Sequence, residues 1–394
     1  GSEMCIRDSY YSKFFHLYVK REEIMKIKRE FLICTAIFVL MASLPLFAIG
    51  ASYGLEEPVN TDTSGVLSKV ESSKSESKTE KTPSKTESKA TSSEAKSSES
   101  SQESLIEVSN SDKISADGRF KILDTSTNEV LTLTDEEFLI GAVAAEMPPS
   151  YEPEALKAQC IATYTCYAKK RADERDNPHQ ELNGADFSAD LSKKQIYLTP
   201  DRMKEDCGES YDEIYSKYKS IVEAVKGEVL TYKGELITCT YFAISSGKTD
   251  SFKDIFGKDL PYLTAVSSPY DAFAPNYKSE KAISAEDFKK AFEENSNTVN
   301  FSESADKWIS DIKLTDSGSV KSIKIGGVEF SGSKVREILG LRSACFSVKY
   351  DKEFRFEVKG YGHNVGMSQY GANEMAKEGI GYKGILEHYY NVKI

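Results

Sequence analysis

The stretch 134–170 reads TDEEFLIGAVAAEMPPSYEPEALKAQCIATYTCYAKK, and it decides the fold of its region. Thr134 and Glu137 form the pattern of a capping box, so a helix begins directly after Thr134. Pro148 disfavours helical geometry at the residue before it, which ends that helix. Pro153 suits the first turn of a second helix. The stretch therefore predicts two consecutive helices joined by a proline-containing turn.

One charged residue is out of place in the first of these helices. Every residue in the range 138–147 is apolar or glycine except Glu146, and its neighbours on the same helical face are Val143, Ala142 and Leu139. Burial and the negative end of the helix both favour the protonated acid, which is the form that a general acid needs. The alternative is a glutamate that turns outward at a frayed helix end.

The pattern outside this stretch alternates between strands and helices. Strands with turns are expected in 120–134 and 227–245, a helix in 284–295, strands in 320–330 and a short helix in 332–340. This order does not repeat as a regular βαβ series, so we expect an α+β fold with mixed sheets and flanking helices. We expect residues 117–394 to form a single two-lobed domain with a central substrate cleft.

Three segments precede that domain. Residues 1–24 fit no part of this plan, and we interpret them as lying upstream of the natural start at Met25. Residues 25–50 have a basic start and a long apolar run, which is the pattern of a membrane anchor or a cleaved signal; an anchor is the preferred interpretation. Residues 51–116 are rich in Ser, Lys and Glu and are predicted to be a disordered linker.

Charge and cysteine content exclude several functions. The net charge of −11 argues against a nucleic-acid partner. The 7 cysteines include no CxxC pair, so the sequence holds neither a zinc knuckle nor a redox motif of that type. A disulfide between Cys207 and Cys239 is one interpretation, and buried free thiols are the preferred one.

Four blocks of this sequence resemble the stage II sporulation protein D family, also called the SpoIID/LytB domain. They are the stretch 135–170, YFAISSGKTDSFKDIFGKDLPYLTAVSSPYD (241–271), FSGSKVREILGLRSACFSV (330–348) and GYGHNVGMSQYGANEMAKEG (360–379). The resemblance implies a lytic transglycosylase that cuts stem-peptide-stripped peptidoglycan glycan strands and leaves 1,6-anhydromuramic ends. Glu146 matches the catalytic glutamate of the family's AAEMP segment.

The resemblance also implies a setting and partners for the chain. The catalytic domain is expected outside the cytoplasm, facing the cell wall, on a single-pass anchor, with a role in sporulation during engulfment. A cell-wall amidase and membrane proteins of the engulfment machinery are expected partners. Some family members are described as amidase enhancers, so a non-catalytic enhancer is the alternative function. Some members hold a structural zinc, but the corresponding loop has only His179, so we predict no metal and no cofactor.

The glycine-rich block 360–379 is predicted to line the glycan groove. Its glycines, Gly366 among them, allow left-handed turns and close approach of backbone to a ligand. Its polar side chains supply donors, acceptors and a ring for a sugar: His363, Ser368, Gln369 and Tyr370. The alternative is a glycine-rich turn that only packs against the sheet.

The segment ISSGK (244–248) is predicted to form another wall of the cleft, with Ser245 and Ser246 as substrate-binding residues. It follows an expected strand and contains a Ser-Gly turn. The sequence has no GxSxG motif, so a nucleophilic role for Ser246 is disfavoured.

Overall fold

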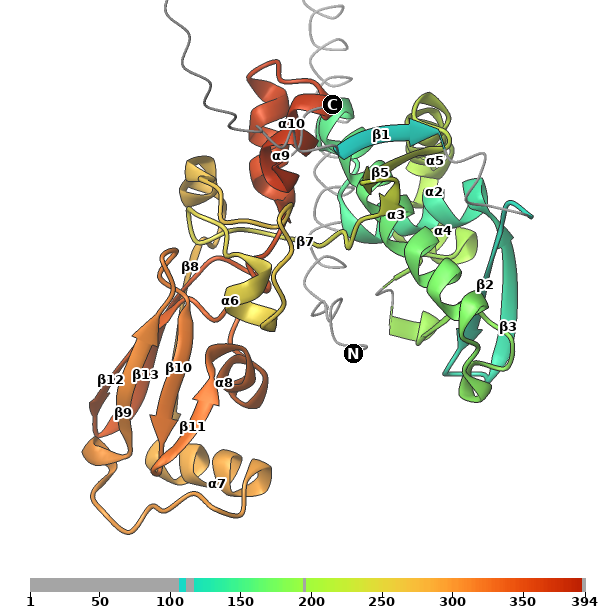
Figure 1. Ribbon diagram of the computed structural model, residues 1–394. Coiled ribbons are helices and arrows are strands. Elements are labelled where there is room, and N and C mark those ends of the chain that lie inside the picture. The colour runs from blue at the N-terminus through green and yellow to red at the C-terminus, as the bar shows by residue number, and fades with distance from the viewer. Residues whose placement is uncertain (1–105, 111–116, 194–195, 392–394) are drawn as a thin grey trace, which may run out of the picture. The chain divides into compact units, whose positions relative to one another are not determined.

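The computed structural model describes residues 106–110, 117–193 and 196–391 (Figure 1), all within one compact unit of the chain. Within these ranges, no helix is long and apolar enough to cross a membrane. The segments 1–24 and 25–50, and with the latter the expected anchor, lie outside the described residues.

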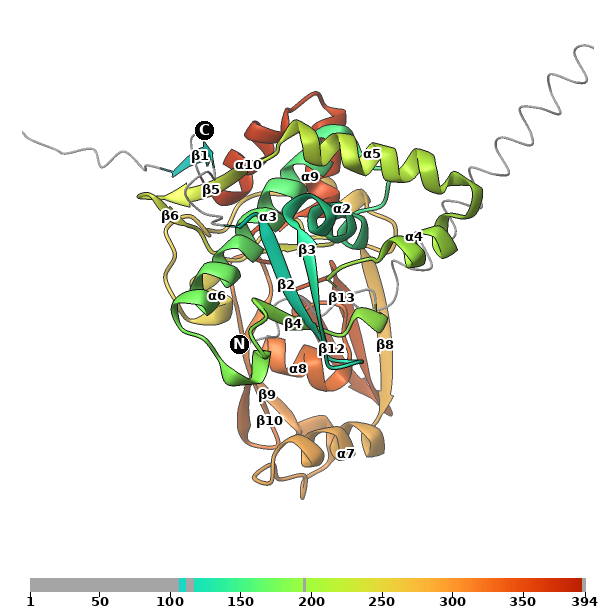
Figure 2. The same ribbon diagram turned by 90° about the vertical axis from the view of Figure 1, so that its right-hand side faces the viewer.

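A three-stranded sheet and two long helices form the beginning of the fold. β2 (Arg119–Asp124) pairs antiparallel with β3 (Glu129–Thr134) and parallel with β4 (Phe187–Ala189). Phe120 and Ile122 of β2 are fully buried, as expected of a strand with alternating sides. α2 (Asp135–Glu146) follows β3 directly, and α3 (Pro153–Asp176) packs on α2; Figure 2 shows these elements together. The two consecutive helices predicted from 134–170 are therefore confirmed.

The next elements cover α2 and α3. They are α4 (Pro200–Cys207), α5 (Tyr211–Ala224), β5 (Glu228–Tyr232) and β6 (Glu235–Leu236). β5 pairs antiparallel with β6 and with β1 (Ile106–Asn110), in the order β1-β5-β6. β1 lies inside the segment 51–116 that was predicted to be a linker, so this short part of it forms a strand. Its residues alternate apolar and polar in IEVSN, which is compatible with a strand.

The C-terminal helices join the same hydrophobic core. β7 (Tyr241–Phe242) pairs in parallel with β14 (Met367–Ser368), and α6 (Phe252–Phe256) follows β7. α9 (Gln369–Lys377) and α10 (Tyr382–Tyr390) come after β14 and lie side by side (red in Figure 1). Leu386, Tyr389 and Tyr390 of α10 are buried in this core.

A second hydrophobic core is built from the segment between α6 and β14. Two three-stranded antiparallel sheets contribute to it, in the orders β12-β13-β8 and β11-β10-β9. Their elements are β8 (Lys278–Ser284), α7 (Ala285–Asn295), β9 (Ile309–Leu314), β10 (Val320–Ile325), β11 (Val328–Ser331), α8 (Gly332–Leu339), β12 (Phe346–Asp351) and β13 (Glu353–Lys359). Phe288 stacks on Phe354 with a ring-centroid distance of 4.1 Å, and both are buried.

These elements confirm the predicted α+β class with mixed sheets and flanking helices. The structure also separates two hydrophobic cores, which is compatible with the expected two lobes. The central substrate cleft stays a prediction.

The cysteines of the described residues are all free thiols. Cys160, Cys207, Cys239 and Cys345 are buried and Cys166 is half-buried. A disulfide between Cys207 and Cys239 is therefore wrong, and the preferred interpretation of buried thiols is confirmed. Burial raises the pKa of Cys160 to about 12, so this thiol stays protonated and inert at neutral pH.

Candidate active site

Glu146 is the last residue of α2, and its side chain lies in the protein interior. The helix begins with the predicted capping box, in which Thr134 and Glu137 each accept a hydrogen bond from the other's backbone N–H. It ends because Met147, before Pro148, has extended backbone angles of φ −129° and ψ 138°. Glu146 is only 5% exposed, so the alternative of an outward-turned glutamate is wrong.

Gln369 holds the carboxyl group of Glu146. Its Nε2 donates to Glu146 Oε2 at 2.9 Å and joins residues that are 223 positions apart. Gln369 itself is 0% exposed. A buried carboxyl group needs such partners, because an unpaired polar group in the interior costs free energy. The glycine-rich block 360–379 is thus connected to Glu146 by a direct side-chain contact.

Two polar side chains of α3 continue this contact. Gln369 Nε2 also donates to Gln159 Oε1 at 3.3 Å, and Gln159 Nε2 donates to Thr163 Oγ1 at 3.0 Å. Gln159 and Thr163 are each 0% exposed. We call Glu146, Gln369, Gln159 and Thr163 the buried polar row. Sequence reasoning missed Gln159 and Thr163, although the apolar neighbours of Gln159 in the helix expected after Pro153 were an available signal.

The position of Gln369 depends on the pairing of β14 with β7. α9 begins at Gln369, directly after β14. Ser368 caps this helix, because its Oγ accepts from Gly371 N at 3.2 Å. Tyr370 N donates to Ala243 O at 3.0 Å, just beyond β7. The strand pair and the helix cap together aim Gln369 at Glu146.

Glycines bring the strands of this region close together. Gly366 has φ +80°, and a Cβ atom there would lie 2.1 Å from Thr240 O. Gly360 has φ +77°, and its Cβ would lie 2.8 Å from Ile244 O. The predicted left-handed turns are therefore confirmed at both positions. The close approach seen is to the protein's own backbone, and approach of Gly366 to a glycan stays a prediction.

Asp271 gathers the hydroxyl groups of three serines. It lies in the short helix η5 (Pro269–Phe273) and is 0% exposed. Ser245 Oγ donates to it at 2.8 Å, Ser268 Oγ at 2.5 Å and Ser368 Oγ at 2.6 Å. Burial raises the pKa of Asp271, although these hydrogen bonds act in the opposite direction. The hydroxyls of Ser245 and Ser368 thus serve the fold, and sugar binding by them stays a prediction.

Ser246 takes part in a second buried network. Its Oγ donates to Lys248 O at 3.1 Å, and its backbone N–H donates to Asn364 Oδ1 at 3.2 Å. Asn364 Nδ2 donates to Asp250 Oδ2 at 2.8 Å, and Ser319 Oγ donates to the same oxygen at 2.6 Å. These contacts tie the ISSGK segment to the glycine-rich block. Binding of a substrate by Ser246 stays a prediction.

His363 lies between aromatic rings. Its ring centroid is 5.5 Å from that of Phe242 and 6.0 Å from that of Phe256, and its Nδ1 accepts from Val365 N at 3.2 Å. Burial lowers the pKa of His363 to about 4, and the charge of Arg336 acts in the same direction. His363 is therefore neutral at pH 7 and does not supply a positive charge to a ligand there.

Tyr370 is the predicted binding residue next to Gln369 along α9, and its side chain is half-buried. Burial raises its pKa, and the charges of Glu374 and Asp271 act the same way. Its hydroxyl stays protonated at neutral pH and retains a hydrogen to donate. Of the predicted set, the structure brings Gln369 into contact with Glu146, and Tyr370 follows Gln369 in the first turn of α9.

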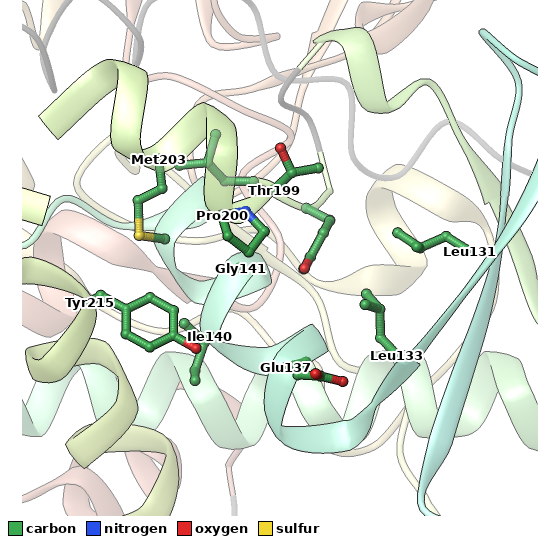
Figure 3. Close-up of a pocket in the computed structure, with 11 residues that line it drawn as sticks. Leu131, Leu133, Glu137, Ile140, Gly141, Thr199, Pro200, Met203 and Tyr215 are labelled. Carbon is green, nitrogen blue, oxygen red and sulfur yellow. The ribbon is translucent and has the colours of Figure 1, made fainter. Parts of the chain in front are cut away.

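A pocket of about 270 Å³ lies against the first half of α2 (Figure 3). Its walls come from β3, α2, α4, α5 and the segment before α4, and they are mostly apolar. The lining residues are Leu131, Leu133, Glu137, Ile140, Gly141, Tyr197, Leu198, Thr199, Pro200, Met203 and Tyr215. None of the predicted site residues is among them, so the pocket is separate from the polar row.

No group of three or more metal-ligating side chains occurs among residues 106–110, 117–193 and 196–391. His179, considered above as a zinc ligand, has its Nδ1 2.6 Å from Glu174 Oε2. That contact raises the pKa of His179.

Comparison with known proteins identifies the family of this chain. The model of the family described as "Stage II sporulation protein" matches residues 124–232. The chain is 33% identical to stage II sporulation protein D of Bacillus subtilis (strain 168) over 267 residues, which are 68% of this chain and 75% of the relative. It is 32% identical over 269 residues to the protein of the same name from Bacillus amyloliquefaciens, with the same coverage of 68% and 75%.

A more distant relative carries a different name. The amidase enhancer of Bacillus subtilis (strain 168) is 27% identical over 301 residues, which are 64% of this chain but only 39% of that protein.

The identity and the coverage of the two stage II sporulation protein D relatives establish the family assignment. The chain belongs to the stage II sporulation protein D family.

Proposed function

We propose that this chain is a lytic transglycosylase that cleaves the glycan strands of peptidoglycan between N-acetylmuramic acid and N-acetylglucosamine. The observation that carries the proposal is the buried Glu146 carboxyl group, which Gln369 Nε2 holds at 2.9 Å. A general acid must be held in a defined orientation, and the hydrogen bond from Gln369 to the buried carboxyl group of Glu146 supports this role.

A single carboxyl group is sufficient for this reaction. Glycoside hydrolases usually need a second carboxylate as nucleophile or as base for a water molecule. In the proposed reaction, Glu146 gives its proton to the glycosidic oxygen, and the bond between that oxygen and muramic C1 breaks. The C6 hydroxyl oxygen of the same muramic residue then bonds to C1, and its proton goes to Glu146. The product is a 1,6-anhydromuramic end, and no water is consumed.

Family membership and the N-terminal segments support a proposed cellular setting. We place the reaction in sporulation, during engulfment, on glycan strands already stripped of stem peptides. Residues 25–50 would anchor the chain in the membrane, and the Ser/Lys/Glu-rich segment would let the catalytic domain reach the wall. A cell-wall amidase that strips the peptides and membrane proteins of the engulfment machinery are the partners we propose.

A second function is supported by the similarity to the amidase enhancer. In that case the chain would bind the wall and raise the activity of an amidase without cutting glycan. The retained glutamate at position 146 favours the catalytic proposal, because an enhancer has no need of a buried acid.

Mass spectrometry of the products separates the two functions. The full chain is incubated with peptide-free glycan strands, and the fragments are examined for anhydromuramic ends. The catalytic proposal expects such ends with the chain alone. Their absence, together with faster peptide release when an amidase is added, would support the enhancer instead.

A further inference from the structure

The amide of Gln369 is incompletely paired. Both of its N–H groups are used, one by Glu146 at 2.9 Å and one by Gln159 at 3.3 Å. Its Oε1 is buried and has no hydrogen-bond partner within the part of the chain that the structure describes. A buried carbonyl oxygen without a partner is unusual and calls for an explanation. It also means that no other hydrogen bond within the described residues fixes which end of the amide faces Glu146, so the protonation state of Glu146 can decide the orientation.

The observed arrangement suits the carboxylate form. A carboxylate only accepts hydrogen bonds, so Gln369 must face Glu146 with Nε2. The protonated form carries an O–H that needs an acceptor, and Gln369 can offer one only if its amide turns over and presents Oε1. One end of the amide then still lacks a partner, so the unpaired end does not favour either arrangement over the other.

The rest of the row can follow this reversal. Once Gln369 presents Oε1, Gln159 must turn its own amide so that Nε2 donates to it. Gln159 Oε1 then faces Thr163, whose hydroxyl changes from acceptor to donor by rotation about one bond. In the present arrangement Gln159 Nε2 donates to Thr163 Oγ1 at 3.0 Å, and after the turn Gln159 Oε1 would take the place of Nε2 and accept from this hydroxyl.

We propose that Gln369, Gln159 and Thr163 are positioning residues whose hydrogen bonds reverse together, so that both protonation states of Glu146 are held in one orientation. The inference rests on the proposed function, in which Glu146 begins as the acid and then acts as the base. When the carboxyl group is ionised, Gln369 donates to both Glu146 and Gln159, and Gln159 donates to Thr163. When the group is protonated, Glu146 and Gln159 both donate to Gln369 Oε1, and Thr163 donates to Gln159 Oε1. Each catalytic cycle contains one reversal at the loss of the proton and one at its return.

Side-chain NMR tests the reversal without any need for activity. The chain has five glutamines, Gln102, Gln159, Gln180, Gln195 and Gln369, so selective ¹⁵N labelling of glutamine amides in the full chain gives a simple spectrum. We expect the amide signals of Gln159 and Gln369 to move with one midpoint as pH is varied. The exposed Gln180 provides an internal reference.

Variants show which titrating group moves the amide signals of Gln159 and Gln369. Glu146→Gln should abolish it for both amides, and Gln369→Leu should abolish it for Gln159. Titratable groups near the row include Tyr218 of α5, which donates to Met147 O, and Asp271 behind Ser368. They also include Cys160 and Cys166 of α3 and Tyr370 next to Gln369. A response that survives Glu146→Gln belongs to one of them. Gln159 signals that stay fixed while those of Gln369 move would overturn the proposal.

Kinetics with matched threonine variants tests the role in turnover. Thr163→Val removes the end of the row, and we expect kcat to fall by about tenfold, as for loss of one orienting hydrogen bond, with KM changed less than about twofold. Thr163→Ser keeps the hydroxyl and should restore kcat. Thr165→Val is the control: Thr165 is another fully buried threonine of α3, but it bonds Ile161 O and Leu230 N instead of the row.

The outcomes separate this inference from the proposed function. If the wild-type chain forms no anhydro ends, the proposed function fails, and the NMR titration still decides whether the row reverses. If the wild-type chain cleaves glycan, we expect Thr163→Val to lose kcat while Thr165→Val loses only stability. Equal kcat losses in the two valine variants, or full kcat in Thr163→Val, would overturn the role of the row in turnover.

Discussion

Gly366→Ala tests whether the turn before β14 requires a glycine for space as well as for its backbone angle. Gly366 has φ +80°, and the added Cβ would lie 2.1 Å from Thr240 O and 2.6 Å from Thr240 Oγ1. Thr240 O cannot move freely, because it accepts from Met367 N at 3.1 Å and from Tyr390 OH at 2.9 Å. The substitution must therefore disturb either the pairing of β14 or these two hydrogen bonds.

The expected loss of stability has two parts. A left-handed backbone angle costs a residue with a Cβ about 1–2 kcal/mol. Forcing an extra carbon against a fixed carbonyl, with weakening of its hydrogen bonds, adds about 2–3 kcal/mol. We expect Gly366→Ala to lower the free energy of unfolding by about 3–5 kcal/mol.

Gly379→Ala provides the matched control. Gly379 has a similar φ of +85°, but nothing lies within 4 Å of the position that its Cβ would take. Its replacement should cost only the backbone part, about 1–2 kcal/mol. Both losses are read from urea unfolding of the full chain, followed by circular dichroism. Equal losses in the two variants would refute the argument that Gly366 is needed for close approach to Thr240.

Three further predictions concern titration and metal. The raised pKa of Asp271 means that the folded chain binds this proton more tightly than the unfolded chain, so its contribution to stability falls as pH rises above the ordinary value of 3.8. Asp271→Asn should remove the slope that begins above about pH 4 in urea unfolding, and an unchanged slope would contradict it. The pKa of His363 is lowered from 6.5 to about 4, so its contribution is present above pH 6.5 and is lost as pH falls through that window. His363→Asn should flatten this loss and leave the pH dependence of kcat unchanged between about pH 6 and 7, whereas a vanished kinetic limb there would make His363 an acid/base partner. EDTA should change neither Tm nor activity, and stoichiometric zinc in elemental analysis would show a ligand set that we have missed.

Local patterns predicted part of the fold, including the two consecutive helices and the first strand pair. The capping box at Thr134, the prolines after Glu146 and the alternation in 120–134 are short-range signals, and the structure has helices and strands where they indicate. The unexpected strand β1 has only five residues, and a partner far away in the sequence, Glu228–Tyr232, stabilises it. A composition-based boundary cannot detect such a pairing.

The site was only partly accessible to sequence reasoning. A lone acid in an apolar helix marked Glu146, and the glycine-rich block marked the neighbourhood of Gln369. The hydrogen bonds from Ser245 and Ser368 to Asp271 could not be predicted from local sequence patterns. They join residues that are 26 and 97 positions apart in the chain. The row from Glu146 to Thr163 likewise joins three helices, and only the tertiary structure determines which polar side chains meet.

The most direct test of the central claim is the turnover of peptide-free glycan by Glu146→Gln. The introduced amide has nearly the shape of the carboxyl group and can still accept from Gln369 Nε2, so Tm should stay within a few degrees of the wild type. It has no proton to give to the glycosidic oxygen, so the rate of formation of anhydromuramic ends should fall by a factor of about 10² or more. A correctly folded Glu146→Gln chain that produces anhydromuramic ends at the wild-type rate would contradict the assignment of Glu146 as the catalytic acid.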